Sequence, residues 1–151
     1  MTAENETPDT NESPRDRADG APLESDADDY CVLQVSINGK TVGWLNASGD
    51  NYLGISQERV GATAFRFPAG GGYVLPPYGD AGQRGLGISD RGYPQFYLRS
   101  DWWSQWKLVR GYFLCENNLQ FVGIENPDDP YGSWLQANNA LTPLKLTRQT
   151  L

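Results

Sequence analysis

The sequence predicts an all-β domain, and three observations lead to this expectation. Seventeen glycines and ten prolines interrupt the 151-residue chain, and no window of helical length carries apolar residues at spacings of three and four. Short runs instead alternate apolar and polar residues, as Leu-Lys-Leu does at 144–146, which is typical of half-buried strands. The segment 32–46 has Asn38-Gly39 at its centre, the pair that a two-residue type I′ hairpin turn favours.

Residues 1–29 differ in composition from the rest of the chain. They hold ten acidic residues against two arginines and no aromatic residue, which gives them a charge of −8 and leaves +1 of the total −7 for the remainder. Such a segment buries too little apolar surface to offset the entropy of ordering it. We therefore expect a disordered acidic arm at 1–29, which solvates the chain, holds it off anionic surfaces or docks a basic partner. One folded domain is expected at 30–151.

Three short sequence motifs, here called words, recur along this domain. A Gly-Ile pair stands at 54–55, 87–88 and 123–124, at steps of 33 and 36 residues. A glycine–aromatic–aliphatic run precedes each pair, and an apolar–basic–apolar run follows it. The preceding runs begin at Gly43, Gly72 and Gly111, and the following runs begin at Phe65, Trp106 and Leu144. The pattern predicts three β-units at about 43–71, 72–110 and 111–148, with further strands at 95–99 and 133–136.

This pattern of words resembles the β-trefoil, most closely its fascin-like and lectin-like members, in which a strand similar to Tyr52-Leu53-Gly54-Ile55 is followed later by a Trp- or Phe-centred strand. The resemblance covers about 30–151. It implies three four-stranded units around a pseudo-threefold axis. Only nine residues separate Ile55 from Phe65, so the third strand of the first unit is expected to be short or displaced. A β-sandwich or another small barrel is the alternative fold.

The repeats divide the aromatic residues into two groups. Rings in repeated apolar positions are expected in the core, because a repeated apolar position is usually structural. The expected core positions are Trp44, Phe65, Tyr73, Trp106, Tyr112 and Leu144. Rings in the unrepeated loops are expected to bind a ligand, since loops lie on the surface and often carry function. Lids folded back on the barrel are the alternative role for those rings.

The loop rings lie beside carboxylate and amide side chains, which is the combination that sugars require. A ring stacks on the apolar C–H face of a pyranose, while carboxylates and amides bond its hydroxyl groups. The expected ligand-binding residues are Asp90, Tyr93, Trp102 and Trp103 in the second unit and Asp128, Asp129, Tyr131, Trp134 and Asn138 in the third. The first unit has no ring in the corresponding loop, so at most two sites are expected.

Ricin-type lectins carry a Gln-x-Trp word in each unit, and the matching triplets here end at Phe65, Trp106 and Leu144 without that glutamine. The ligating residues of that family are therefore not carried over. We expect a non-catalytic, lectin-like module that binds a carbohydrate or glycoconjugate. The alternative is a protein-interaction module, as fascin-like and inhibitor-like trefoils are, with Trp102 and Trp103 in a partner's pocket.

Several function classes are not expected. The chain contains no histidine, which removes the usual catalytic triads and the commonest metal ligand, and it has no phosphate-binding or nucleophile-elbow motif. We therefore expect no enzyme, no cofactor and no metal. A nearly neutral domain behind an acidic arm is not expected to bind nucleic acid, and no apolar run reaches membrane-spanning length.

The first residues show no secretory signal, so a cytoplasmic protein is expected, with export by another route left open. Two cysteines, Cys31 and Cys115, stand far apart and match no metal or redox spacing. We expect both to be reduced and buried. A single bridge between them stays open for an oxidising compartment.

Overall fold

The computed structural model describes residues 21–22, 30–47, 51–67, 72–77 and 82–151. Over these residues the chain forms strands and two short 3₁₀ turns, η1 (Arg59–Gly61) and η2 (Ser100–Trp102), and no α-helix. The prediction of an all-β domain is confirmed. The predicted acidic arm lies outside the described residues except for Ala21–Pro22, which forms strand β1.

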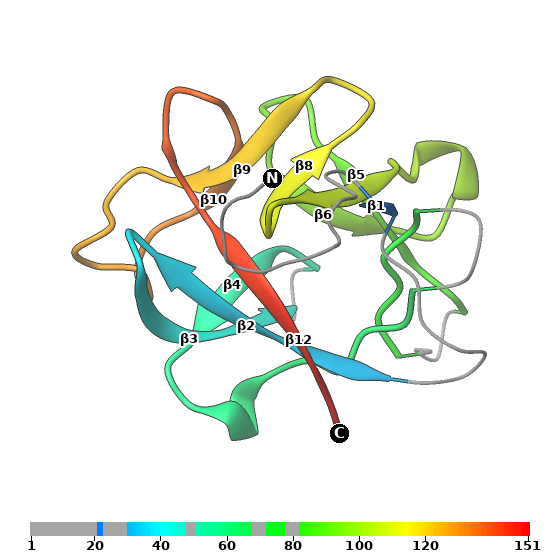
Figure 1. The fold of residues 1–151 in the computed structure, drawn as a ribbon. Helices are drawn as coiled ribbons and strands as arrows, with labels where there is room; N and C mark the ends of the chain where they lie inside the picture. The colour runs from blue at the N-terminus through cyan, green and yellow to red at the C-terminus, as the bar shows by residue number, and fades with distance from the viewer. Residues whose placement is uncertain (1–20, 23–29, 48–50, 68–71, 78–81) are drawn as a thin grey trace.

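Ten of the described strands form one sheet that curls into a nearly closed barrel (Figure 1). Its strands are β1 (Ala21–Pro22), β2 (Cys31–Ile37), β3 (Lys40–Ala47), β4 (Leu53–Ser56), β7 (Trp106–Val109), β8 (Tyr112–Cys115), β9 (Gln120–Ile124), β10 (Leu135–Ala137), β11 (Thr142–Pro143) and β12 (Lys145–Thr150). The order β1-β7-β8-β12-β2-β3-β4 runs around the barrel, and β9 joins it to β10 and β11. The remaining strands, β5 (Gly85–Ile88) and β6 (Pro94–Tyr97), pair with each other.

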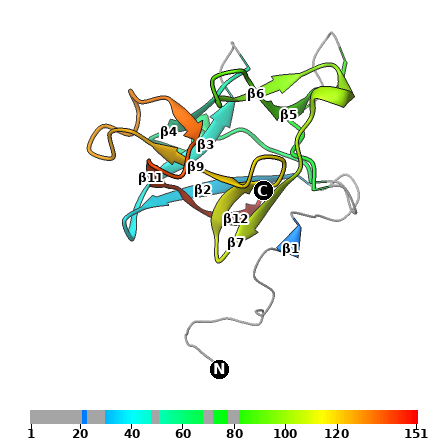
Figure 2. The ribbon, with the colours of Figure 1, turned by 90° about the horizontal axis from the view of Figure 1, so that it is seen from above.

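Most strands that follow one another in the chain pair as antiparallel hairpins. Figure 2 shows the β3–β4 and β5–β6 hairpins on one side and β7 and β12 on the other. The last strand of the chain helps to close the barrel. Strand β12 pairs with β2 along six residues, from Lys145 opposite Ser36 to Thr150 opposite Cys31. The predicted strands at 95–99 and 133–136 are present in shorter form as β6 and β10.

Two hairpin turns place residues in the left-handed region. Asn38 and Gly39 join β2 to β3 with φ angles of 53° and 79°, as the sequence predicts for a type I′ turn. Arg110 and Gly111 join β7 to β8 with φ angles of 55° and 89°, although Arg110 is not a residue that favours this region. Both turns suit the right-handed twist of the strands they connect.

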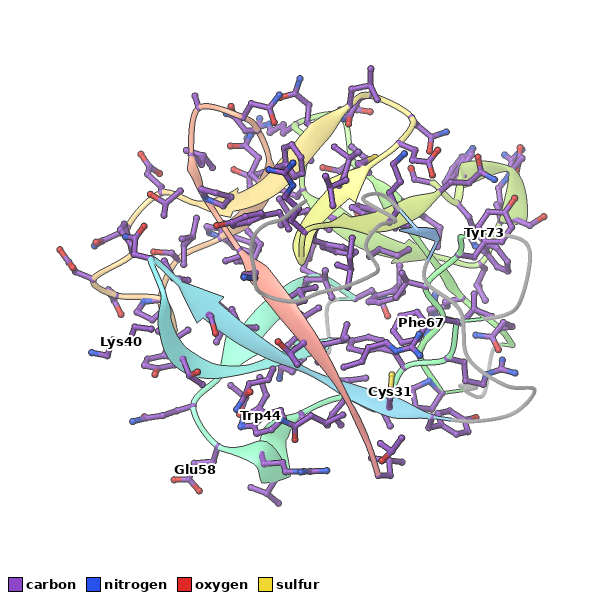
Figure 3. The ribbon with its side chains drawn as sticks, in the orientation of Figure 1. Cys31, Lys40, Trp44, Glu58, Phe67 and Tyr73 are labelled. Atoms are coloured by element: carbon purple, nitrogen blue, oxygen red, sulfur yellow. The ribbon has the colours of Figure 1, made fainter. Side chains whose placement is uncertain are left out.

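The core is apolar and continuous through the barrel. Trp106 is its largest fully buried side chain; its ring stacks on Phe113 with centroids 4.7 Å apart, and its indole N–H donates to the Leu86 carbonyl at 3.0 Å. Figure 3 shows Phe67 and Cys31 turned towards this interior, and both are buried. The predicted core positions Phe65, Trp106 and Leu144 are fully buried, so this part of the prediction is confirmed.

The other three predicted core rings are not buried, and this part of the prediction is wrong. Tyr112 is 38% exposed, and Trp44 and Tyr73 are half-buried. Successive side chains in a strand point to opposite faces, so in β3 and β8 the residue that follows the ring faces the core instead: Leu45 and Phe113 are fully buried. Val74, which follows Tyr73 outside the named strands, is fully buried as well. Trp44 instead lies under the guanidinium of Arg59, 5.2 Å from the ring centroid, at the periphery of Figure 3.

The Gly-Ile word occupies two different positions in the fold. Gly54-Ile55 lies in β4, the second strand of its hairpin, whereas Gly87-Ile88 and Gly123-Ile124 lie in β5 and β9, the first strands of theirs. After Ile55 the chain makes the η1 turn and forms no strand before the isolated bridge at Phe65, as the short spacing there predicts. Equal spacing of the word therefore does not mark equivalent strands.

Two kinds of backbone hydrogen bond recur between the hairpins and the segments around them. The first kind runs from Thr63 to Leu45, from Ser104 to Leu86 and from Leu144 to Val122, at 3.2, 2.9 and 3.0 Å. The second kind runs from Phe65 to Cys31, from Trp106 to Gly72 and from Leu146 to Gly111, at 2.8, 2.7 and 2.8 Å. The backbone N–H group is the donor in every bond. Each donor of the second kind lies two residues after the corresponding donor of the first kind: Phe65 after Thr63, Trp106 after Ser104 and Leu146 after Leu144.

Both cysteines are unpaired and buried, as the sequence predicts. Burial raises the pKa of each thiol; Arg148 partly offsets the effect at Cys31, and hydrogen bonds around Cys115 partly offset it there. A thiol whose pKa is raised in the folded state stabilises the fold below its unfolded pKa and loses that contribution as the pH rises.

We expect the free energy of unfolding to fall as the pH rises from 7.5 to 10, because the unfolded thiols ionise above about pH 8.5 while the folded thiols stay neutral. Urea unfolding followed by circular dichroism at several pH values measures this. A Cys31→Ala, Cys115→Ala variant keeps the other titrating groups and should show a shallower decline. Equal slopes for the two proteins would contradict the expectation.

Candidate functional site

Three aromatic rings from three different hairpins meet at one place in the fold. Tyr52, Tyr93 and Trp134, here called the aromatic trio, have ring centroids 5.5 to 6.4 Å apart. Tyr52 meets the other two rings nearly edge to face, at 85° and 82°, and Tyr93 is tilted by 54° to Trp134. These are favourable geometries for aromatic pairs, so the rings hold one another in place.

Each ring of the trio stands directly before the second strand of a hairpin. Tyr52 precedes β4, Tyr93 precedes β6 and Trp134 precedes β10. The next residues, Leu53, Pro94 and Leu135, pair with the ends of β3, β5 and β9, respectively. The three rings therefore have the same place in three separate hairpins, which is why they converge.

Backbone contacts between neighbouring hairpins fix the positions of the rings. The N–H of Phe96 in β6 donates to the Asn51 carbonyl at 2.8 Å, beside Tyr52. The N–H of Ala137 in β10 donates to the Gly92 carbonyl at 2.8 Å, beside Tyr93. The side-chain amide of Gln136 also donates to the Arg91 carbonyl at 2.6 Å. The trio is thus built on paired strands rather than on free loops.

The trio offers an aromatic surface with amide groups on the same side. Trp134 is 59% exposed, while Tyr52 and Tyr93, which contact it, are half-buried. Residues two apart in a strand share a face, so Gln95 lies on the face of Tyr93, and Gln136 lies on the face of Trp134. The arrangement combines an apolar platform with hydrogen-bonding groups.

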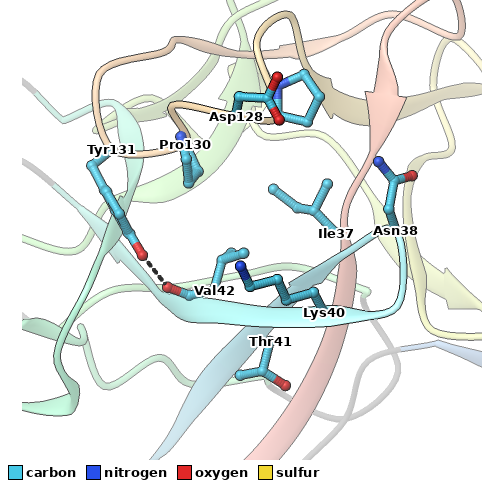
Figure 4. A pocket seen from close by; sticks show the side chains of 9 residues that line it. Ile37, Asn38, Lys40, Thr41, Val42, Asp128, Pro130 and Tyr131 are labelled. Carbon is cyan, nitrogen blue, oxygen red and sulfur yellow. Dashed lines mark hydrogen bonds between the residues drawn. The ribbon is translucent and has the colours of Figure 1, made fainter.

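A second candidate site is a groove between the β2–β3 hairpin and the loop that follows β9 (Figure 4). Its volume is about 400 Å³. The groove is lined by Ile37, Asn38, Lys40, Thr41, Val42, Pro127, Asp128, Pro130 and Tyr131. Figure 4 shows Lys40 on the hairpin wall and Asp128 on the opposite, loop wall. Opposite charges therefore face the same small volume.

Both walls of the groove are held by hydrogen bonds. The Tyr131 hydroxyl donates to the Val42 carbonyl at 2.6 Å and ties the loop to β3. Asn126 begins the loop turn: its side-chain oxygen accepts from the N–H of Asp128 at 3.2 Å, and its carbonyl accepts from the N–H of Asp129 at 3.1 Å. The Ser133 hydroxyl donates to the Asp129 carbonyl at 3.0 Å. The groove is therefore formed before any ligand arrives.

A third candidate site surrounds Trp102, whose side chain is 51% exposed. Its ring meets Tyr97 edge to face at 5.3 Å, and the Arg99 guanidinium lies over it at 4.6 Å. Arg99 also makes two hydrogen bonds to Asp101, at 3.1 and 2.6 Å, and holds the pKa of that carboxyl below its ordinary value. These four residues are called the Trp102 patch.

The predicted ligand-binding residues are thus distributed over separate places. Tyr93 and Trp134, expected in different sites, meet in the aromatic trio, and Asp128 and Tyr131 line the groove. Trp102 belongs to its own patch. Asp90 and Asp129 are exposed in turns beside the trio and the groove, respectively, without lining the groove.

Two predicted site residues make structural contacts. The Trp103 indole N–H donates to the Tyr97 carbonyl at 2.7 Å, and the ring packs so closely on Gly85 that a Cβ there would lie 2.2 Å from it. The side-chain oxygen of Asn138 accepts from the N–H of Ala140 at 2.9 Å and closes a turn. Stacking on Trp103 and ligation by Asn138 would have to compete with these contacts.

Sequence reasoning missed Tyr52 in the trio and, in the groove, Lys40 and every other lining residue except Asp128 and Tyr131. The signal for Tyr52 is its place directly before a strand, which Tyr93 and Trp134 share. No comparable signal marks Lys40, because it reaches the groove only through packing of the β2–β3 hairpin against a loop 85 or more residues away.

Comparison of the chain with protein-family models, curated proteins and solved structures gave no match. Over the described ranges, no cluster of three or more metal-ligating side chains is present. In the same part of the chain, no helix is long and apolar enough to cross a membrane.

Proposed function

We propose that the chain is a non-catalytic, lectin-like module that binds carbohydrate at the aromatic trio. The observation that carries this proposal is the Trp134 ring, 59% exposed and held against two half-buried tyrosines. An exposed, immobilised indole presents the apolar surface on which the C–H face of a pyranose packs. A ring already ordered by its neighbours loses little conformational entropy when a ligand binds.

The polar half of a sugar also finds partners at the trio. Gln95 and Gln136 carry amide groups on the strand faces that bear Tyr93 and Trp134. An amide both donates and accepts, which matches hydroxyl groups that do the same. Gln95 already accepts from the Tyr97 hydroxyl at 3.0 Å, and Gln136 donates to the Arg91 carbonyl at 2.6 Å. Each side-chain amide carries two N–H groups, so orientation of the sugar is assigned to the N–H groups of Gln95 and Gln136 that these bonds do not use, and most of the buried contact to Trp134.

We further propose that the domain is a β-trefoil, with one hairpin in each of three units. The two recurring kinds of hydrogen bond support this, because each kind occurs once per hairpin. In the second kind of hydrogen bond, the donors in the three units are Phe65, Trp106 and Leu146. The structural equivalent of Phe65 and Trp106 in the third unit is therefore Leu146, rather than Leu144. Each unit then contributes one ring to the trio, so a single composite site replaces the two separate sites expected from the loops.

Replacing Trp134 with alanine is expected to weaken glycan binding by about 30-fold or more, as truncation of an aromatic hot spot does. The glycan class is found first by probing a glycan array with the labelled chain, and affinities for the best glycan are then measured by calorimetry. Trp102→Ala is the matched control, since it removes an exposed tryptophan of similar accessibility outside the trio. Equal losses in both variants, or none in Trp134→Ala, would contradict the proposal.

A protein-interaction module is the second candidate, and the Trp102 patch favours it. An exposed tryptophan beneath an arginine is typical of residues that dominate protein interfaces. A blank array from a folded chain, combined with a partner whose capture requires Trp102 but not Trp134, would replace the carbohydrate proposal with this one.

A further inference from the structure

We infer that the groove between the β2–β3 hairpin and the loop after β9 is a second, separate site, which takes a sugar carrying a carboxylate, such as a hexuronic acid. The inference rests on the proposed carbohydrate binding and specifies a ligand class for a place other than the trio. None of the three trio residues lines the groove.

The charges of the groove orient an anionic sugar. Among the described residues, neither the Lys40 ammonium nor the Asp128 carboxylate takes part in an ion pair, and both side chains are exposed. Lys40, on the hairpin wall, can bind the carboxylate of the ligand. Asp128, on the loop wall, repels that carboxylate and accepts hydrogen bonds from the hydroxyl groups of the sugar. A uronic acid offers both groups on one ring, whereas a neutral hexose leaves Lys40 without an ionic partner.

The apolar part of the groove suits a pyranose ring. The Tyr131 ring cannot turn freely, because its hydroxyl is bonded to the Val42 carbonyl at 2.6 Å. Pro127 and Pro130 stiffen the same wall, and the buried Ile37 lies opposite. A volume of about 400 Å³ is at the small end of ligand sites, which accommodates one sugar unit rather than a long chain.

The test is a titration of the full chain, labelled with ¹⁵N, with glucuronic acid and with glucose. Glucuronic acid should shift the backbone amide signals of 37–42 and of Asp128, Asp129 and Tyr131. It should also bind about fivefold more tightly than glucose, as expected for one exposed ion pair. Lys40→Gln should remove this preference, and Lys40→Arg should retain it. The preference should also shrink as the salt concentration rises.

Each result bears on one of the two sites. Equal affinity for the two sugars, a preference that survives in Lys40→Gln, or shifts confined to residues outside the groove would overturn the inference. Trp134→Ala should leave glucuronic acid binding at the groove unchanged. Suppose that Trp134→Ala keeps glucuronic acid binding at the groove and also binds the array glycans as tightly as the wild type. The trio proposal then fails, while the groove assignment stands.

Discussion

Replacing Trp106 with alanine is expected to destabilise the domain by about 3–5 kcal/mol, the usual cost of removing a large buried aromatic side chain. Trp106 is fully buried, stacks on Phe113 and donates a hydrogen bond to the Leu86 carbonyl. The substitution removes all of these contacts and leaves a cavity at the centre of the barrel. Since small domains are stable by only about 5–15 kcal/mol, the variant should be close to the limit of folding.

Urea unfolding followed by far-ultraviolet circular dichroism measures this loss without depending on tryptophan fluorescence. Trp106→Phe keeps a ring at the site and loses mainly the indole hydrogen bond, so it should cost less than the alanine variant. Trp102→Ala removes a tryptophan that is 51% exposed and should change stability by less than about 1 kcal/mol. A Trp106→Ala variant as stable as Trp102→Ala would show that Trp106 is not central to the core.

Replacing Gly43 with alanine is expected to be the second most damaging change, at about 1–3 kcal/mol or more. A Cβ at Gly43 would lie 2.2 Å from the Ser56 carbonyl oxygen and 3.2 Å from the Ile55 side chain. The carbonyl belongs to backbone paired between β3 and β4, so it cannot move aside without separating the two strands. The thermal midpoint should therefore fall sharply.

Gly54→Ala in the neighbouring strand β4 is the matched control. Its Cβ would meet only the side-chain oxygen of Asn46, at 3.2 Å, and that group can rotate away. Both changes add one methyl group to a glycine in the same hairpin, so their difference isolates the backbone clash. Similar thermal midpoints for the two variants would contradict the explanation.

The parts of the fold that depend on neighbouring residues could be predicted from the sequence. The Asn38-Gly39 hairpin is one such part, because the turn is specified by two adjacent residues whose φ angles are positive. The burial of Trp44 and Tyr112 was predicted wrongly, because a word of three residues does not reveal which of its members faces the core. The buried Leu45 and Phe113 decide the register, and only the packed sheet shows them.

The candidate sites required the tertiary structure. The loop position of Tyr93 and Trp134 marks them as surface rings, but their contact depends on hairpins that are distant in the sequence. Tyr52 was overlooked because the Gly-Ile word placed its hairpin one strand out of phase with the other two. The groove likewise joins a turn at 38–39 to a loop at 127–131, a juxtaposition that no local pattern specifies.

The pairing of β12 with β2 has a consequence for how the chain reaches this structure. The ladder joins Thr150 to Cys31 and Lys145 to Ser36, so more than a hundred residues separate each pair in the sequence. The entropy lost in closing a loop grows with its length, and topologies rich in such distant pairings fold slowly. Local hairpins such as β2–β3 can form early, because their strands are close in the sequence. Closing the barrel through the β12–β2 ladder joins residues that are far apart in the sequence, so we expect this step to be slower.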